Sequence, residues 1–149
     1  MSCPYEKGIL NKSDFAKVKR RRLRGEIVAV LSRKLDNRGL DLITSMTRVV
    51  LQNEIHELIL TDEQSAGPGK NVDGVAYIGF FEVKTGGLVV VGDQISVDGK
   101  FIGEVVGFDE THSPNHLNIV MQARERRTGL EFNLELGDEV IIEVNRRAH

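Results

Sequence analysis

With 149 residues, 40% of them hydrophobic and 28% charged, the chain has the size and composition of one globular domain with a sizeable core. Its formal net charge of −2 argues against a protein whose whole surface binds nucleic acid. No apolar run approaches the ~20 residues that a membrane-spanning helix needs, so we expect no membrane partner. The start lacks the apolar core of a signal peptide, and the one cysteine, Cys3, cannot form an internal disulfide, which predicts a cytoplasmic location.

Residues 1–24 are predicted to form a lead-in that contains a short basic helix. Ser13 is a suitable N-cap for this helix, and Gly25 is a suitable residue to end it. In the alternative, the stretch 20–24 already belongs to the strand that we expect over residues 25–32.

Strand-forming residues recur along the middle of the chain. Valine, isoleucine, threonine and aromatic residues are frequent in the segments 40–51, 55–61 and 75–83, which favours strands there. A helix over residues 47–60 stays open as an alternative. The Gly-rich and polar segment 62–74 is predicted to be the longest loop.

The clearest turn signal is Asp98-Gly99, which lies between two strand-like segments. This dipeptide fits a two-residue hairpin, because both central residues of a type I′ turn need a positive φ. With the strand-like residues 116–121 that follow, the stretch 94–121 predicts a three-stranded antiparallel meander. Residues 134–144 repeat the pattern of residues 89–97, which is an apolar run, then Gly-Asp, then alternation. We expect residues 130–144 to form the closing strands.

These signals together predict a mainly β fold: a small antiparallel β-barrel or sandwich of about eight short strands, with a short N-terminal helix. We expect residues 25–144 to form this single domain and residues 145–149 to be a frayed tail.

The segment between residues 109 and 116 concentrates side chains that could bind a ligand. It contains Asp109, Glu110, His112, Asn115 and His116, and a divalent metal is the cofactor that such side chains could hold, through His112 and His116. Pro114 excludes the regular helical pair of zinc-binding histidines, so only a loop could bring the two imidazoles together. In the alternative, Asp109 and Asn115 shape a wide turn and His116 opens a strand.

A basic run at the start of the domain is the candidate nucleic-acid site, through Arg20, Arg21, Arg22 and Arg24. No aromatic residues alternate with these arginines for base stacking, and the positive charge is local. We therefore favour a solvated face, or a patch of a subunit interface that meets acidic residues.

Short motifs in the second half of the chain follow an order that is characteristic of one family. They are Tyr77-Ile-Gly79, Gly86-Gly87, Gly92-Asp93, Val106-Gly107 and Asn115–Val120. In this order, residues 73–144 resemble the glucitol/sorbitol-specific IIA component of the bacterial sugar phosphotransferase system. The resemblance implies a small β-barrel, and it aligns His116 with the histidine that opens a strand in the family. Gly79 falls where the family has its phospho-accepting histidine, so phosphotransfer by that route would be lost.

The preferred hypothesis is a non-catalytic β-barrel that acts as a binding or assembly module, forms homo-oligomers and has a protein partner. One alternative is a phosphocarrier-like relative of the IIA family, which would need His112 or His116 to accept phosphate. Another is a metal-dependent enzyme that uses Asp109, Glu110, His112 and His116.

Overall fold

The computed structural model describes residues 20–145, and every regular element in that part is a β-strand. The strands are β1 (Leu23–Val30), β2 (Lys34–Leu35), β3 (Leu40–Asp41), β4 (Thr47–Val50), β5 (Ile55–Thr61), β6 (Asn71–Val72), β7 (Val75–Thr85), β8 (Gly87–Val90), β9 (Gln94–Val97), β10 (Lys100–Asp109), β11 (Asn118–Gln122) and β12 (Glu139–Glu143). The predicted mainly β class is confirmed. Within residues 20–145, no helix is long and apolar enough to cross a membrane.

The predicted N-terminal helix is wrong over its described part. Leu23 and Arg24 already belong to β1, where they pair with Ile142 and Ile141 of β12. β1 pairs with β12 on one side and with β7 on the other, and these contacts with distant parts of the chain override the weak local helix signal. The rest of the predicted helix, from Ser13 to residue 19, lies outside the described residues.

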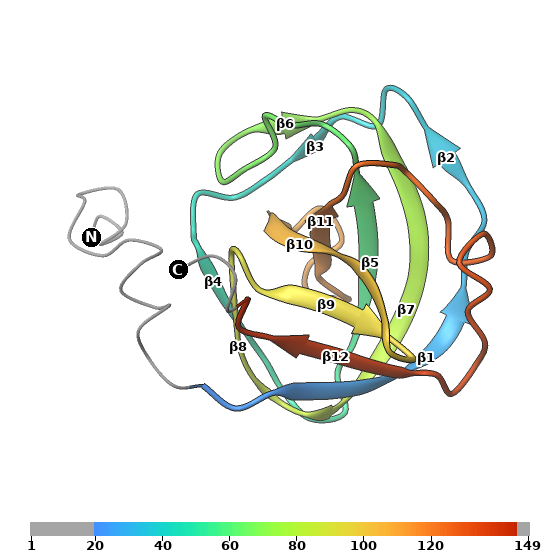
Figure 1. The fold of residues 1–149 in the computed structure, drawn as a ribbon. Coiled ribbons are helices and arrows are strands. Elements are labelled where there is room, and N and C mark those ends of the chain that lie inside the picture. Colours follow the sequence, from blue (N-terminus) through green and yellow to red (C-terminus); the bar gives the residue numbers. More distant parts are fainter. Residues whose placement is uncertain (1–19, 146–149) are drawn as a thin grey trace, which may run out of the picture.

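One eight-stranded sheet dominates the molecule, in the order β1-β12-β9-β10-β11-β5-β7-β2 (Figure 1). β7 also pairs with β1, so the series of pairings returns to the strand where it began. The prediction of a purely antiparallel sheet is wrong at one place, because β11 pairs with β5 in parallel. This pairing joins segments far apart in the chain, and no local turn signal could reveal it.

The hairpin between β9 and β10 forms as its sequence predicts. Asp98 and Gly99 have φ values of 51° and 79°, the left-handed pair that a type I′ turn needs. β10 then pairs with β11, also antiparallel, so the predicted meander of β9, β10 and β11 is confirmed.

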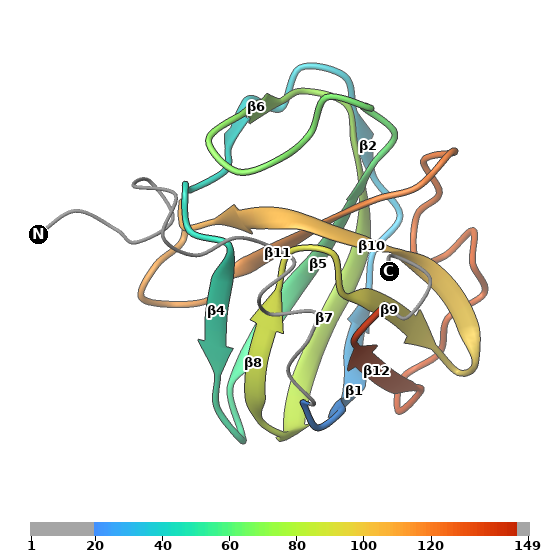
Figure 2. The same ribbon diagram turned by 60° about the vertical axis from the view of Figure 1, so that its left-hand side comes forward.

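Two apolar clusters are buried against different faces of β5. Leu58 and Leu60 belong to the main core, whereas Ile59 belongs to a second cluster with Val72 of β6 and Val120 of β11. Successive residues of a strand point to opposite faces, so both faces of β5 are covered. The β3–β6 pair, which covers the second cluster, lies at the top of the molecule, and the separate β4–β8 pair lies to one side (Figures 1 and 2).

Candidate functional site

The loop between β10 and β11 holds the predicted ligand-binding residues, and its first anchor is Asp109. This residue is only 2% exposed. Its carboxyl oxygens accept hydrogen bonds from the Thr111 hydroxyl at 2.8 Å, the Thr111 backbone N–H at 3.3 Å and the Asn118 amide at 2.8 Å. Asp109 therefore holds the turn and the start of β11, as in the alternative that we drew from the sequence. Glu110 is exposed, and its carboxyl group lies 3.6 Å from Arg48.

The loop does bring the two predicted histidines together. The rings of His112 and His116 stack, with their centroids 4.9 Å apart and their planes inclined by 28°. The Asn115 side-chain nitrogen lies 3.1 Å from Nδ1 of His116, and the His116 ring also meets the edge of Phe80, with centroids 5.1 Å apart. His112 and Asn115 are exposed, whereas His116 is largely covered. The three predicted residues thus form one group in the loop that joins the end of β10 to the start of β11.

A row of side chains crosses four neighbouring strands beneath this group. Asp109 of β10 pairs with Asn118 of β11, Asn118 with Glu57 of β5, and Glu57 with Phe80 of β7. Side chains of directly paired residues lie on the same face of a sheet, within reach of one another. Glu57, which we did not single out from the sequence, is therefore part of the cluster. A charged residue inside the apolar run of residues 55–60 was the one signal that could have marked it.

Glu57 and His116 form the titratable centre of the cluster. The Glu57 carboxyl group lies 3.4 Å from Nε2 of His116, and their side chains are 8% and 12% exposed. Burial raises the pKa of Glu57 to about 7; the charge of Arg38 opposes this rise and the charge of Asp109 adds to it. The pair therefore changes its proton content close to neutral pH.

The pKa of His116 is shifted in the opposite direction. Burial lowers it, and the neighbouring imidazoles of His112 and His56 lower it further. The neighbouring Asn118 side chain and the charge of Asp109 act against this shift. Burial therefore disfavours the charged form of both Glu57 and His116, so the pair favours a neutral carboxylic acid beside a neutral imidazole.

His56 of β5 has a structural role near the same loop. Its Nδ1 accepts the Leu117 backbone N–H at 3.0 Å, and its Nε2 lies 3.1 Å from the Glu54 carboxyl group. The backbone N–H of Leu51 lowers the pKa of Glu54 by donating to it. His56 therefore ties β5 to the start of β11.

A metal site finds little support in this geometry. Among residues 20–145, no three histidine, cysteine, aspartate or glutamate side chains are grouped so that they could hold a metal ion. The stacked rings of His112 and His116 would have to act with fewer protein ligands than the three that catalytic zinc sites use.

An open pocket lies at the opposite end of β10 and β11. Its volume is about 540 Å³, and its walls include Phe101, Ile102, Arg124, Glu125, Arg127 and Phe132. These residues come from the start of β10 and from the segment that follows β11. Phe101 is 56% exposed, so a large apolar ring stands in the mouth of the pocket.

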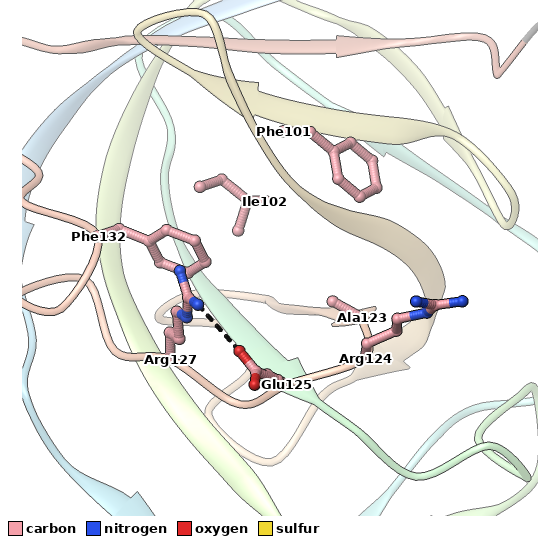
Figure 3. Close-up of a pocket in the computed structure, with 7 residues that line it drawn as sticks. All are labelled: Phe101, Ile102, Ala123, Arg124, Glu125, Arg127 and Phe132. Atoms are coloured by element: carbon pink, nitrogen blue, oxygen red, sulfur yellow. Dashed lines mark hydrogen bonds and ion pairs between the residues drawn. The ribbon is translucent and has the colours of Figure 1, made fainter.

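Figure 3 shows how the side chains of the pocket lie. Phe101 and Phe132 stand on opposite sides of Ile102, and Arg127 is joined to Glu125 at 2.9 Å. The Arg127 guanidinium also lies over the Phe132 ring, 6.0 Å from its centroid. We did not predict this pocket from the sequence, because its phenyl rings, Phe101 and Phe132, come from different segments of the chain.

The model of a family of unknown function, DUF6917, matches residues 17–143. The chain belongs to this family. No curated protein and no solved structure matches it. The match covers every strand of this DUF6917 chain, from β1 to β12, including both the histidine–carboxyl cluster and the open pocket.

The predicted nucleic-acid arginines of this DUF6917 chain mostly bind acidic side chains. Arg20 is paired with the buried Asp93, 3.0 Å from one of its carboxyl oxygens, and also donates to the backbone oxygen of Leu88. Two further ion pairs of the run are Arg22 with Glu143 at 3.3 Å and Arg24 with Glu139 at 2.7 Å. Arg21 lines a separate pocket of about 410 Å³ beside β4 and β8. The run thus meets acidic residues, as in the interpretation that we favoured, although its partners lie within the same chain.

Proposed function

We propose that this protein is a small β-barrel that acts as a binding module, with the open pocket at the start of β10 as its ligand site. The barrel is inferred from the pairings, which run from β1 through β12, β9, β10, β11, β5 and β7 back to β1. A closed sheet has no free edge along this path and offers a rigid frame on which a site can be built.

The observation that carries the proposal is the pocket itself. Its volume of about 540 Å³ lies in the range of small-molecule sites, which are roughly 300–1,000 Å³. Such sites combine apolar walls with a few placed polar groups. Phe101, Ile102 and Phe132 supply the apolar walls here, and the arginines supply the polar groups.

The histidine–carboxyl cluster supports the proposal in a different way. Its central groups are buried and make contacts with one another, with Asp109 holding the loop and His56 holding β11. We infer that this cluster maintains the fold at its end of the sheet, whereas the pocket faces solvent and can admit a molecule.

A phosphocarrier function at residue 79 does not suit the packing. Gly79 of β7 lies against β1, and a Cβ atom there would overlap the backbone oxygen of Ala29. A histidine in this place would push β1 away from β7. Nε2 of His116 is buried and its Nδ1 lies 3.1 Å from the Asn115 amide, so the exposed His112 is the more accessible imidazole for phosphate.

The proposal is tested by mapping a small aromatic probe onto the protein. We expect 2-naphthol to cause saturable chemical-shift changes in the backbone amides of Phe101, Ile102, Ala123 and Phe132. Phe101→Ala should weaken these changes strongly, and Leu136→Ala, which removes an even more exposed apolar side chain outside the pocket, should not. Shifts that are absent, or spread without relation to the pocket, would contradict the proposal.

Self-association, a protein partner and a cytoplasmic location belong to the same proposal. Val49, Leu51 and Ile55 are 58%, 58% and 45% exposed and are close together in the chain, around the turn between β4 and β5. Exposed apolar side chains that gather in one region are typical of interaction surfaces. A native mass spectrum that shows only the monomer would count against the homo-oligomer.

A further inference from the structure

Most cationic side chains around the pocket are paired with an acidic side chain. Arg127 is paired with Glu125, Lys34 with Glu131 at 2.9 Å, and Arg126 with Asp36 at 2.9 Å. Arg126 also lies 3.5 Å from Asp62. Lys100, beside Phe101, donates instead to the backbone oxygen of Phe132 at 3.1 Å. Among the described residues that line this pocket and the pocket next to it, the ion pairs neutralise every cationic side chain except one.

The exception is Arg124. Its side chain is exposed, lines the pocket, and makes no hydrogen bond or ion pair with any residue from 20 to 145. Together with the Arg127–Glu125 pair, it gives the pocket walls a net charge of one positive unit, from two arginines and one glutamate. A guanidinium group presents a planar fork of donors that matches a carboxylate with two parallel hydrogen bonds.

The apolar walls restrict the shape of a ligand. Phe101 and Phe132 stand on either side of Ile102, so a flat ring could lie against the phenyl faces and the isoleucine methyl groups (Figure 3). Aromatic rings prefer offset-stacked or edge-to-face contacts with one another. A flexible alkyl chain would fill the same walls at a greater cost in conformational entropy.

We propose that the pocket binds a small monoanion with a flat apolar body, of the aromatic carboxylate class. The carboxylate binds Arg124, and the ring packs against Phe101 and Phe132. This inference rests on the proposed function of the pocket as a ligand site and adds the chemical class of the ligand.

Three probes that share one ring system test the ligand class at neutral pH. They are 2-naphthoate, the neutral 2-naphthol and the cationic 2-naphthylmethylammonium. We expect naphthoate to bind about tenfold more tightly than naphthol, because a charge-assisted bidentate hydrogen bond replaces a neutral one. The cationic probe should bind most weakly of the three. Dissociation constants come from chemical-shift titrations at low salt, because salt screens the charge of an exposed arginine.

Arg124→Gln should reduce the affinity for naphthoate to that for naphthol and leave the affinity for naphthol unchanged. Lys70→Gln is the matched control, because it removes one exposed positive charge from the loop before β6, outside the pocket walls. This control should retain the preference of the natural chain for naphthoate.

A gain of affinity gives a second test that loss of folding cannot mimic. Glu125→Gln removes the carboxyl group that neutralises Arg127 and frees a second guanidinium for the ligand. We expect naphthoate to bind several-fold more tightly to this variant, while naphthol binds as before.

The outcomes separate the ligand class from the function of the pocket. If naphthol and naphthoate bind equally well at the mapped pocket, or if Arg124→Gln keeps the preference, the ligand class is wrong and the pocket remains a binding site. If none of the three probes shifts the pocket amides, the proposed function fails, and the ligand class fails with it.

Discussion

The two ends of the β10–β11 hairpin differ in what they do with their charged side chains. At the end where the loop 110–117 joins the strands, Asp109 and Glu57 are buried and His116 is largely covered. Asp109 accepts a hydrogen bond from Asn118, and Glu57 lies against His116. At the other end, where β10 begins and β11 ends, Arg124 is exposed beside an open pocket.

The difference separates charges that serve the fold from charges that are available to a ligand. A buried polar group must find partners inside the protein, because an unpaired one costs about 1–3 kcal/mol. At the cluster end, Asp109 and His56 meet this demand through their hydrogen bonds. Within residues 20–145, Nε2 of His116 and Oδ1 of Asn118 are buried there without a hydrogen-bond partner. The pocket end has no such demand, since solvent reaches its charges, and so Arg124 can stay free of a protein partner. A dense group of titratable residues in a sequence can therefore be structural, and a single exposed arginine can be the binding residue.

The largest expected effect comes from removing the anchor of the buried end. Asp109→Ala should lower the free energy of unfolding by about 3 kcal/mol, because the buried amide of Asn118 and the groups of Thr111 lose their acceptor. Urea unfolding followed by circular dichroism measures this loss. Glu110→Ala is the control: the neighbouring carboxyl group is exposed, and its contact with Arg48 should contribute no more than about 1 kcal/mol. If the two variants were equally stable, the buried Asp109 would contribute no more to the fold than the exposed Glu110, and the cluster end would not be structural.

A second effect, of at most about 3 kcal/mol, is expected from the protonation of Glu57, because one unit of pKa change corresponds to about 1.4 kcal/mol. Its pKa rises from 4.5 to about 7 in the folded protein, so the folded state binds this proton more tightly than the unfolded state. The resulting stabilisation is fully present below pH 4.5 and is lost as the pH rises to about 7. The pKa of His116 is lowered, and its contribution runs the other way, falling as the pH drops below the unfolded value of 6.5.

The variant Glu57→Gln isolates the carboxyl group from the histidine. Glutamine resembles the protonated acid in shape and cannot lose a proton, so the stability difference between variant and natural chain should grow in favour of the variant between pH 5 and 8. Unfolding curves over this pH range measure it. A difference that does not change with pH would show that Glu57 titrates as an exposed carboxyl group does.

Local signals predicted the parts of the fold that depend on neighbours in the chain. The Asp98-Gly99 turn, the strand at residues 55–61 and the meander of β9 to β11 were all recognisable from a few consecutive residues. The predicted loop 62–74 is correct except at β6, which is two residues long and is a strand only because β3 pairs with it.

Contacts between distant segments could not be predicted in this way. Nothing near Glu57 indicates that β11 will lie beside it in parallel, so the sequence revealed the loop residues of the cluster and missed its buried acid. The pocket was missed for the same reason, because Phe101, Arg124 and Phe132 become neighbours only when the sheet has formed.

A smaller effect is expected from the stacked histidines of the loop. The imidazole of His112 lowers the pKa of His116, so His112→Ala should raise that pKa, although burial, the larger cause, remains. Carbon-detected or proton-detected NMR of the His116 ring as a function of pH measures the change. A fall of the His116 pKa in this variant would contradict the assigned cause, because it would mean that His112 does not lower that pKa.

The smallest effect on stability is expected at the pocket, where the effect on binding is large. Phe101→Ala should change the free energy of unfolding by no more than about 0.5 kcal/mol, because the ring is already 56% exposed in the folded protein. The same variant should lose most of its affinity for the naphthalene probes, because the ring forms one wall of the pocket. Thermal unfolding and the chemical-shift titration, carried out on one preparation, measure both quantities. If Phe101→Ala instead destabilised the protein as much as Asp109→Ala, the ring would serve the fold, and both ends of the hairpin would be structural.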